Sequence, residues 1–102
     1  MSQSEKILKK YPDRIPIIVN KYKNSNIADI DKKKYIVPKD MNINSFVYVI
    51  RRRIKLTSDQ AIFVTINKEL CASNQTIGEI YNKHKSDDGF LYIEYSGENT
   101  FG

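Results

Sequence analysis

Several residue types are scarce in this sequence, and each shortage excludes a class of protein. The 102 residues include one cysteine and no tryptophan. The single cysteine, Cys71, excludes an internal disulfide, and we expect a small packed side chain there rather than a nucleophile. No apolar run approaches the roughly 20 residues of a membrane span, and residues 1–6 lack the apolar core of a signal peptide. Together these absences favour a protein of the cytoplasm.

Metal and cofactor chemistry also lacks a basis in the sequence. His84 is the one histidine, and no cysteine stands at ligand spacing from it. We therefore expect neither a metal site nor a cofactor.

What the sequence does contain is enough apolar material for one modest core. Hydrophobic residues make up 40% and charged residues 28% of the chain, which is typical of a soluble globular domain. The net charge is +5, from 17 basic and 12 acidic residues. This charge is compatible with a nucleic acid, an anionic membrane or an acidic protein as partner, and it does not choose among them.

Periodicity and punctuation predict the secondary structure. Thr76-x-x-Glu79 has the spacing of a capping box, and so does Ser2-x-x-Glu5, whose helix must end before Pro12. We expect Pro16 at the start of a strand or at a bulge, because proline donates no ladder hydrogen bond. In chain order the pattern predicts a helix over 3–11, strands over 14–22 and 33–37, a helix over 43–54, strands over 61–66 and 69–72, a helix over 76–84 and a strand over 90–95.

This order of elements predicts an α+β fold, specifically a ubiquitin-like β-grasp roll with a mixed sheet and a central helix. We expect residues 1–12 to form a short N-terminal helix, residues 13–96 the ubiquitin-like domain, and residues 97–102 a flexible C-terminal tail. Glycine at the tip of that tail leaves its carboxylate open to attack, because glycine has no Cβ. A free tail is also the ordinary state of a chain end.

Longer stretches of the chain resemble one family. Residues 9–16 read KKYPDRIP, residues 31–38 read DKKKYIVP, residues 88–93 read DGFLYI, and the chain ends in Phe101-Gly102. These stretches, with IRRRI at 50–54 and IGEIY at 77–81, resemble the autophagy ubiquitin-like modifiers of the GABARAP and light-chain-three type. The resemblance extends without gaps from about residue 4 to the end.

The resemblance implies a modifier rather than an enzyme. Gly102 would be the conjugation residue, activated by an activating enzyme, passed to a conjugating enzyme and bonded to phosphatidylethanolamine. A cysteine protease would process and deconjugate the protein. On the autophagosomal membrane, the lipidated form would recruit cargo receptors and adaptors through short motifs with an aromatic residue, two variable residues and an aliphatic residue.

The resemblance also implies where such motifs bind. The segment from Lys32 to Pro38 should be an edge strand that accepts the motif as an added strand. We expect both anchors, three residues apart, on the same side of a slightly twisted strand. The implied aromatic pocket consists of Ile7, Pro16, Lys34, Ile36 and Phe90; the aliphatic pocket consists of Tyr35, Val37, Pro38, Met41, Phe46 and Val49; and the acidic flank would meet Arg14, Lys32 and Arg53.

Simpler roles compete with some of these assignments. Phe46, Val49 and Ile50 all have the helical spacing of core residues. For Phe46 and Val49 a core role and a pocket role have equal weight, and Ile50 is assigned to the core. The resemblance also implies a further helix before the matching region, and we expect this chain, which starts at Met1, to lack it. The whole protein could instead be an unconjugated peptide-binding module. A basic nucleic-acid-binding domain ranks last, because we expect most of the tyrosines to point inward or line the pockets rather than form a stacking platform.

Overall fold

The computed structural model describes residues 2–57, 59–67, 69–70 and 74–97. The elements are α1 (Gln3–Lys10), β1 (Arg14–Lys21), β2 (Lys34–Pro38), α2 (Ile43–Arg53), β3 (Phe63–Ile66), β4 (Glu69–Leu70), α3 (Ile77–His84) and β5 (Leu91–Ser96). Every predicted element is present, and its bounds agree with the prediction to within two residues.

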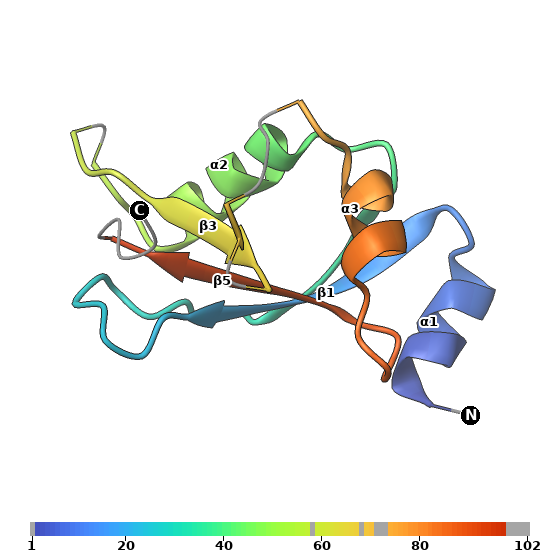
Figure 1. Cartoon of the computed structure of the whole chain (residues 1–102). Helices are drawn as coiled ribbons and strands as arrows, with labels where there is room; N and C mark the ends of the chain where they lie inside the picture. The colour runs from blue at the N-terminus through green and yellow to red at the C-terminus, as the bar shows by residue number, and fades with distance from the viewer. Residues whose placement is uncertain (1, 58, 68, 71–73, 98–102) are drawn as a thin grey trace.

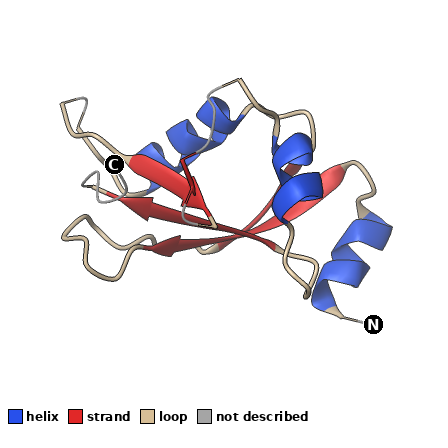
Figure 2. Cartoon of the chain, viewed as in Figure 1, coloured by secondary structure: helices blue, strands red, loops and turns tan. Residues whose placement is uncertain are grey.

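The strands form one mixed sheet in the order β2-β1-β5-β3-β4. The two central strands, β1 and β5, run parallel with Ile17 opposite Leu91, and the other neighbours run antiparallel. Helices α2 and α3 lie over one face of this sheet, as Figures 1 and 2 show. The predicted α+β architecture with a mixed sheet and a central helix is therefore confirmed.

The core lies between the sheet and these two helices. Side chains of a strand alternate between its faces, so every second residue of β1 and β5 points inward. Three residues of α2 are buried, in accordance with the helical spacing that predicted this element. The inward-facing buried apolar residues of β1, α2 and β5 are Ile15, Ile17, Val19, Ile43, Phe46, Ile50, Leu91, Ile93 and Tyr95.

Local capping explains where the helices begin. The Thr76 hydroxyl accepts from the Glu79 N–H, and the Glu79 carboxylate accepts from the Thr76 N–H, which completes the predicted capping box. Ser2 accepts from the Glu5 N–H at 3.2 Å. Helix α2 begins with Asn42, whose side chain accepts from the Asn44 N–H. Each cap satisfies an N–H that the helix itself leaves without a partner.

Helix α1 covers the opposite face of the sheet at one end. In Figure 1 it lies below the strands, whereas α2 and α3 lie above them. Pro16 points to this second face and is nonetheless fully buried, since α1 packs against β1. The Ser4 hydroxyl donates to the Asp88 carbonyl and so ties α1 to the loop before β5. The described fold therefore has a third layer at this end.

The position of Pro16 differs from the expectation. It is the third residue of β1, paired with Ile36, rather than the first residue or part of a bulge. Pairing of β1 with β5 begins one residue later, at Ile17. Pro16 thus lies just before the stretch of β1 that pairs with β5, so its missing N–H costs no hydrogen bond to β5.

Candidate functional site

Strand β2 is an edge strand, as predicted. Its register with β1 determines which of its backbone groups face β1 and which face the open edge of the sheet. The Val19 N–H donates to the Lys33 carbonyl at 2.7 Å, and the Lys39 N–H donates to the Asp13 carbonyl at 2.9 Å. Hydrogen-bonded and non-hydrogen-bonded pairs alternate along an antiparallel ladder. The intervening residues Lys34 and Ile36 therefore direct their N–H and C=O groups away from β1, toward the open edge.

The residues assigned to the aromatic pocket belong to the face that α1 covers. Pro16 stands opposite Ile36 in the β1–β2 register, so their side chains share this face. Phe90 precedes β5 at the level of Pro16, because Ile17 is opposite Leu91. Pro16 and Phe90 are buried, whereas Lys34 and Ile36 are half-buried, as is Ile7 on α1. The set thus combines a buried floor with a partly exposed rim.

Of the residues assigned to the aliphatic pocket, Tyr35 and Val37 point to the other face, toward α2, whereas Pro38 alternates to the face of Ile36. The Tyr35 ring meets the Phe46 ring edge to face, with centroids 5.5 Å apart. Tyr35 and Val37 are 8% exposed and Phe46 is 0% exposed. The half-buried members of the set are Pro38, Met41 and Val49. Phe46, for which core and pocket roles stood equal, is a core residue in this structure.

Apart from Pro38, the two sets consequently lie on opposite faces of β2. The expectation that both anchors of a docked motif lie on the same side of the strand is wrong. Side chains of an extended segment alternate, so residues three apart point to opposite faces. A segment paired with β2 would direct one anchor toward α1 and the other toward α2.

The three cations assigned to the acidic flank already have partners within the chain. Arg53 donates from Nε to Asp31 Oδ1 at 2.8 Å and from Nη2 to Asp31 Oδ2 at 3.4 Å. The hydrogen bonds from Arg53 lower the pKa of the Asp31 carboxyl below its ordinary value. Arg14 Nη1 donates to the Ile36 carbonyl at 3.4 Å. Lys32 Nζ lies 5.1 Å from the centre of the Tyr35 ring.

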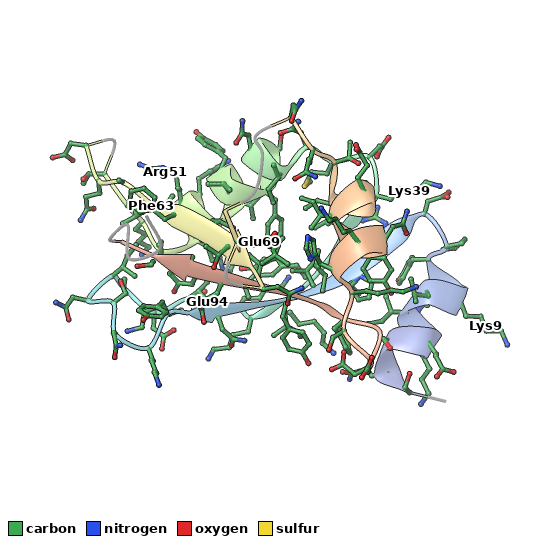
Figure 3. The ribbon with its side chains drawn as sticks, viewed as in Figure 1. Lys9, Lys39, Arg51, Phe63, Glu69 and Glu94 are labelled. Carbon is green, nitrogen blue, oxygen red and sulfur yellow. The ribbon has the colours of Figure 1, made fainter. Side chains whose placement is uncertain are left out.

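The arginine run at the end of α2 does not act as one cationic patch. Arg51 turns to the loop that follows the helix and donates to the carbonyls of Thr57, at 3.0 Å, and Gln60, at 2.8 Å (Figure 3). Arg52 lies beside the Tyr48 ring, with 6.0 Å between the guanidinium carbon and the ring centre. Of the three arginines, Arg53 is the one that contacts Asp31, the residue directly before Lys32-Lys33-Lys34.

Sequence reasoning missed the state of the Tyr35 hydroxyl. The hydroxyl oxygen of Tyr35 is buried and has no hydrogen-bond partner, and it is the one buried side-chain polar atom of the described residues in this state. Burial raises the pKa of this hydroxyl. The alternation along the predicted strand indicates that Tyr35 points inward, but it does not indicate whether a hydrogen-bond partner lies near the hydroxyl oxygen.

Several other assignments stay untested. Cys71 and Gly102 lie outside the described residues. His84 Nδ1 lies 3.0 Å from Asn67 Nδ2. Within the described ranges there is no group of three histidine, cysteine or acidic residues placed to hold a metal ion, and no helix is long and apolar enough to cross a membrane.

The expectation that tyrosines point inward holds only in part. Tyr35, Tyr81 and Tyr95 are buried, but Tyr11 and Tyr92 are about two-fifths exposed and Tyr48 is 61% exposed. The three exposed rings come from different elements: Tyr11 follows α1, Tyr48 is on α2 and Tyr92 is on β5.

A sheet of this topology, crossed by one central helix and open at β2, defines a ubiquitin-like protein. The whole chain, residues 1–102, matches the model of the family described as "Autophagy protein Atg8 ubiquitin like". The chain therefore belongs to the Atg8 family of ubiquitin-like autophagy proteins.

Curated and solved relatives agree with this placement. The chain is 55% identical to autophagy-related protein 8a of Arabidopsis thaliana, over all of this chain and 84% of that protein. It is 56% identical to autophagy-related protein 8 of Schizosaccharomyces pombe, over 99% of this chain and 84% of that protein. The structure of Trypanosoma brucei ATG8 is similar with a TM-score of 0.88 and 43% identity, over 97% of this chain and 85% of that one.

A further similar structure is that of Plasmodium falciparum Atg8 in complex with a Plasmodium falciparum Atg3 peptide. Its TM-score is 0.86 at 30% identity, and the match covers 94% of this chain and 85% of that one.

Proposed function

We propose that this protein is a modifier conjugated through Gly102 to phosphatidylethanolamine on autophagosomal membranes, and that it is not itself an enzyme. Membership of the Atg8 family supports the proposal, as does the glycine at the end of the sequence. Two acyl chains provide a stable anchor, whereas one short chain gives only marginal membrane binding. The protein would then be cytoplasmic before lipidation and membrane-bound after it.

Conjugation requires enzyme partners. We infer an activating enzyme, a conjugating enzyme and a cysteine protease that processes and deconjugates the protein. The solved complex of Plasmodium falciparum Atg8 with an Atg3 peptide supports a peptide contact with the conjugating enzyme.

The second part of the proposal is that β2 docks cargo receptors and adaptors through short motifs. The observation that carries it is the open edge of β2 with an apolar set on each face. Lys34 and Ile36 direct their backbone groups to the open edge, where an added strand could pair with them, which is the basis of β-augmentation. The Ile36 carbonyl already accepts a hydrogen bond of 3.4 Å from Arg14, which an added strand would have to share or replace. Lys32, Lys33 and Lys34 beside them favour acidic residues in the partner.

The alternation of side chains gives the motif its spacing. An aromatic anchor would lie over Pro16 and Phe90, beside α1, and an aliphatic anchor over Val37 and Phe46, beside α2. An odd separation, such as three residues, sends two anchors to opposite faces, whereas a separation of two or four sends both to one face. Burial of one large anchor contributes roughly 1.5–3 kcal/mol, so micromolar affinity is expected.

Conjugation is tested by incubating the full chain with the activating and conjugating enzymes, ATP and liposomes that contain phosphatidylethanolamine. The lipid mass should appear on the unchanged protein and not on a variant that lacks Gly102. If a known substrate of the same enzymes is lipidated and this chain is not, the conjugation proposal is wrong. Retained peptide binding would then identify an unconjugated interaction module.

Peptide docking is tested with an acidic peptide whose aromatic and aliphatic residues are three apart, and with peptides of the same composition whose anchors are two or four apart. Only the first should bind with micromolar affinity. Lys34→Glu should weaken binding by about tenfold or more, since like charges then face each other. Lys83→Glu on α3 is the matched control, because it makes the same charge change on an exposed residue outside the site.

Two results would contradict the docking proposal. One is equal affinity for all three spacings, and the other is an equal effect of Lys34→Glu and Lys83→Glu. Steeply salt-dependent binding of RNA or DNA would favour the nucleic-acid alternative instead.

A further inference from the structure

Asp31 is an acidic residue directly before the run Lys32-Lys33-Lys34, and it binds the arginine closest to that run. The Asp31 carboxylate accepts two hydrogen bonds from the Arg53 guanidinium, at 2.8 Å and 3.4 Å. Paired contacts of this kind match the fork of a guanidinium to both oxygens of a carboxylate. The arrangement is the one that a carboxylate of a docked acidic segment would adopt at Arg53.

Both side chains of this ion pair are exposed, the arginine by 46% and the aspartate by 72%. An exposed pair is screened by water and contributes little to stability. The pair can therefore exchange partners without unfolding its surroundings. The carboxyl keeps its charge to a lower pH than an ordinary aspartate, because Arg53 lowers its pKa.

We propose that Asp31 is a specificity-determining residue of the β2 site, where it competes from within the chain for Arg53. The inference rests on the proposed docking of peptides at β2. A motif with an acidic flank must displace Asp31 before its carboxylate engages Arg53, so part of the gain from that flank is lost. A motif with a neutral flank leaves the pair intact and loses nothing. Asp31 thus reduces the preference of the site for acidic flanks.

The experiment compares two peptides with the same two anchors, one with an acidic flank and one with that flank made of serine and glutamine. Asp31→Asn should strengthen binding of the acidic peptide by about two- to fivefold, the range expected for loss of an exposed competing pair. Binding of the neutral peptide should be unchanged. Affinities are measured by calorimetry on the full chain at one fixed salt concentration.

A matched control separates the local contact from the overall charge. Asp29→Asn makes the same charge change two residues away, at an exposed aspartate that is not the partner of Arg53. It should strengthen binding of the acidic peptide by less than Asp31→Asn does. In the Arg53→Gln background the two aspartate variants should become equal, since no arginine remains to compete for. Unchanged circular dichroism of each variant verifies that the fold is retained.

Two outcomes would overturn the inference. They are equal effects of Asp31→Asn and Asp29→Asn in the unchanged background, and a gain from Asp31→Asn that still exceeds the gain from Asp29→Asn in the Arg53→Gln background. Both outcomes leave docking at β2 standing, provided that the neutral peptide binds. If the unchanged protein binds neither peptide, docking at β2 and competition by Asp31 are both rejected.

Discussion

Replacing Gly89 with alanine tests the contact that holds α1 against the sheet. Gly89 has φ +86°, in the region that favours glycine, and a Cβ built there would overlap Ser4 Oγ and lie 2.9 Å from Ser4 Cβ. The backbone conformation alone costs an alanine of order 1–3 kcal/mol. Relief of the overlap requires Ser4 to move, which breaks the hydrogen bond from Ser4 to the Asp88 carbonyl and costs roughly 1 kcal/mol more.

We therefore expect Gly89→Ala to lower the free energy of unfolding by about 2–4 kcal/mol, measured by urea denaturation. Gly97→Ala is the comparison, because the φ of Gly97 is not positive. Its Cβ would lie in tight contact, 3.2 Å from Ile27 Cβ, so we expect a loss of stability that is smaller than the loss at Gly89. Adding Ser4→Gly removes the atoms that the new Cβ meets, so the double variant should lose less than the sum of the two single losses.

Strict additivity of the Ser4 and Gly89 substitutions would refute the overlap, and a Gly89→Ala loss no larger than that of Gly97→Ala would refute the whole reasoning. The variant also bears on function, because α1 carries Ile7, on the rim of the set assigned to the aromatic anchor. A folded Gly89→Ala protein should therefore bind the aromatic-anchored peptide more weakly than Gly97→Ala does.

Three further predictions concern buried side chains. Tyr35→Phe removes a buried hydroxyl without a partner, so urea denaturation should show no loss of stability and a gain of up to about 1 kcal/mol; a clear loss would reveal a partner for that oxygen. Burial raises the pKa of Tyr95 to about 12, above its ordinary value of 10.0. The stability that comes from burying the neutral hydroxyl is therefore fully present below pH 10 and is lost as the pH rises through 12. Unfolding free energy should fall by about 1–2 kcal/mol over that interval, and less steeply in Tyr95→Phe; parallel profiles would exclude this role. Phe46→Ala should cost about 3–5 kcal/mol because the ring is fully buried, whereas half-buried Val49→Ala should cost less than half as much, and equal urea midpoints would contradict the assignment of Phe46 to the core.

The sequence predicted the elements well where periodicity and local chemistry agree. The Thr76–Glu79 capping box and the spacing of Phe46 and Ile50 report directly on one helix each. Pro16 was placed less well, because its tolerance depends on where β5 begins to pair with β1, and this is a property of the sheet rather than of the segment. The burial of Pro16 likewise depends on α1, which the local pattern does not connect with that face.

The candidate site divides in the same way. Its members could be identified by resemblance, and the edge position of β2 follows from the order of the elements. The pairing of Arg53 with Asp31 could not be predicted, since it joins residues 22 positions apart through the packing of α2 beside β2. The missing partner of the Tyr35 hydroxyl is also a fact of three-dimensional packing.

The placement of the two sets on opposite faces gives the edge strand a selectivity that neither set has alone. A segment that pairs with Lys34 and Ile36 is held in an extended conformation, so the separation of its anchors decides which faces they reach. Each set has a floor of fully or almost fully buried residues, Pro16 and Phe90 on one side and Val37 and Phe46 on the other. These floors are buried, so only the rims and the cations can adapt to a partner. Selection among partners that share the anchor spacing therefore depends on the charged residues at the edge, where Asp31 and Arg53 already engage each other.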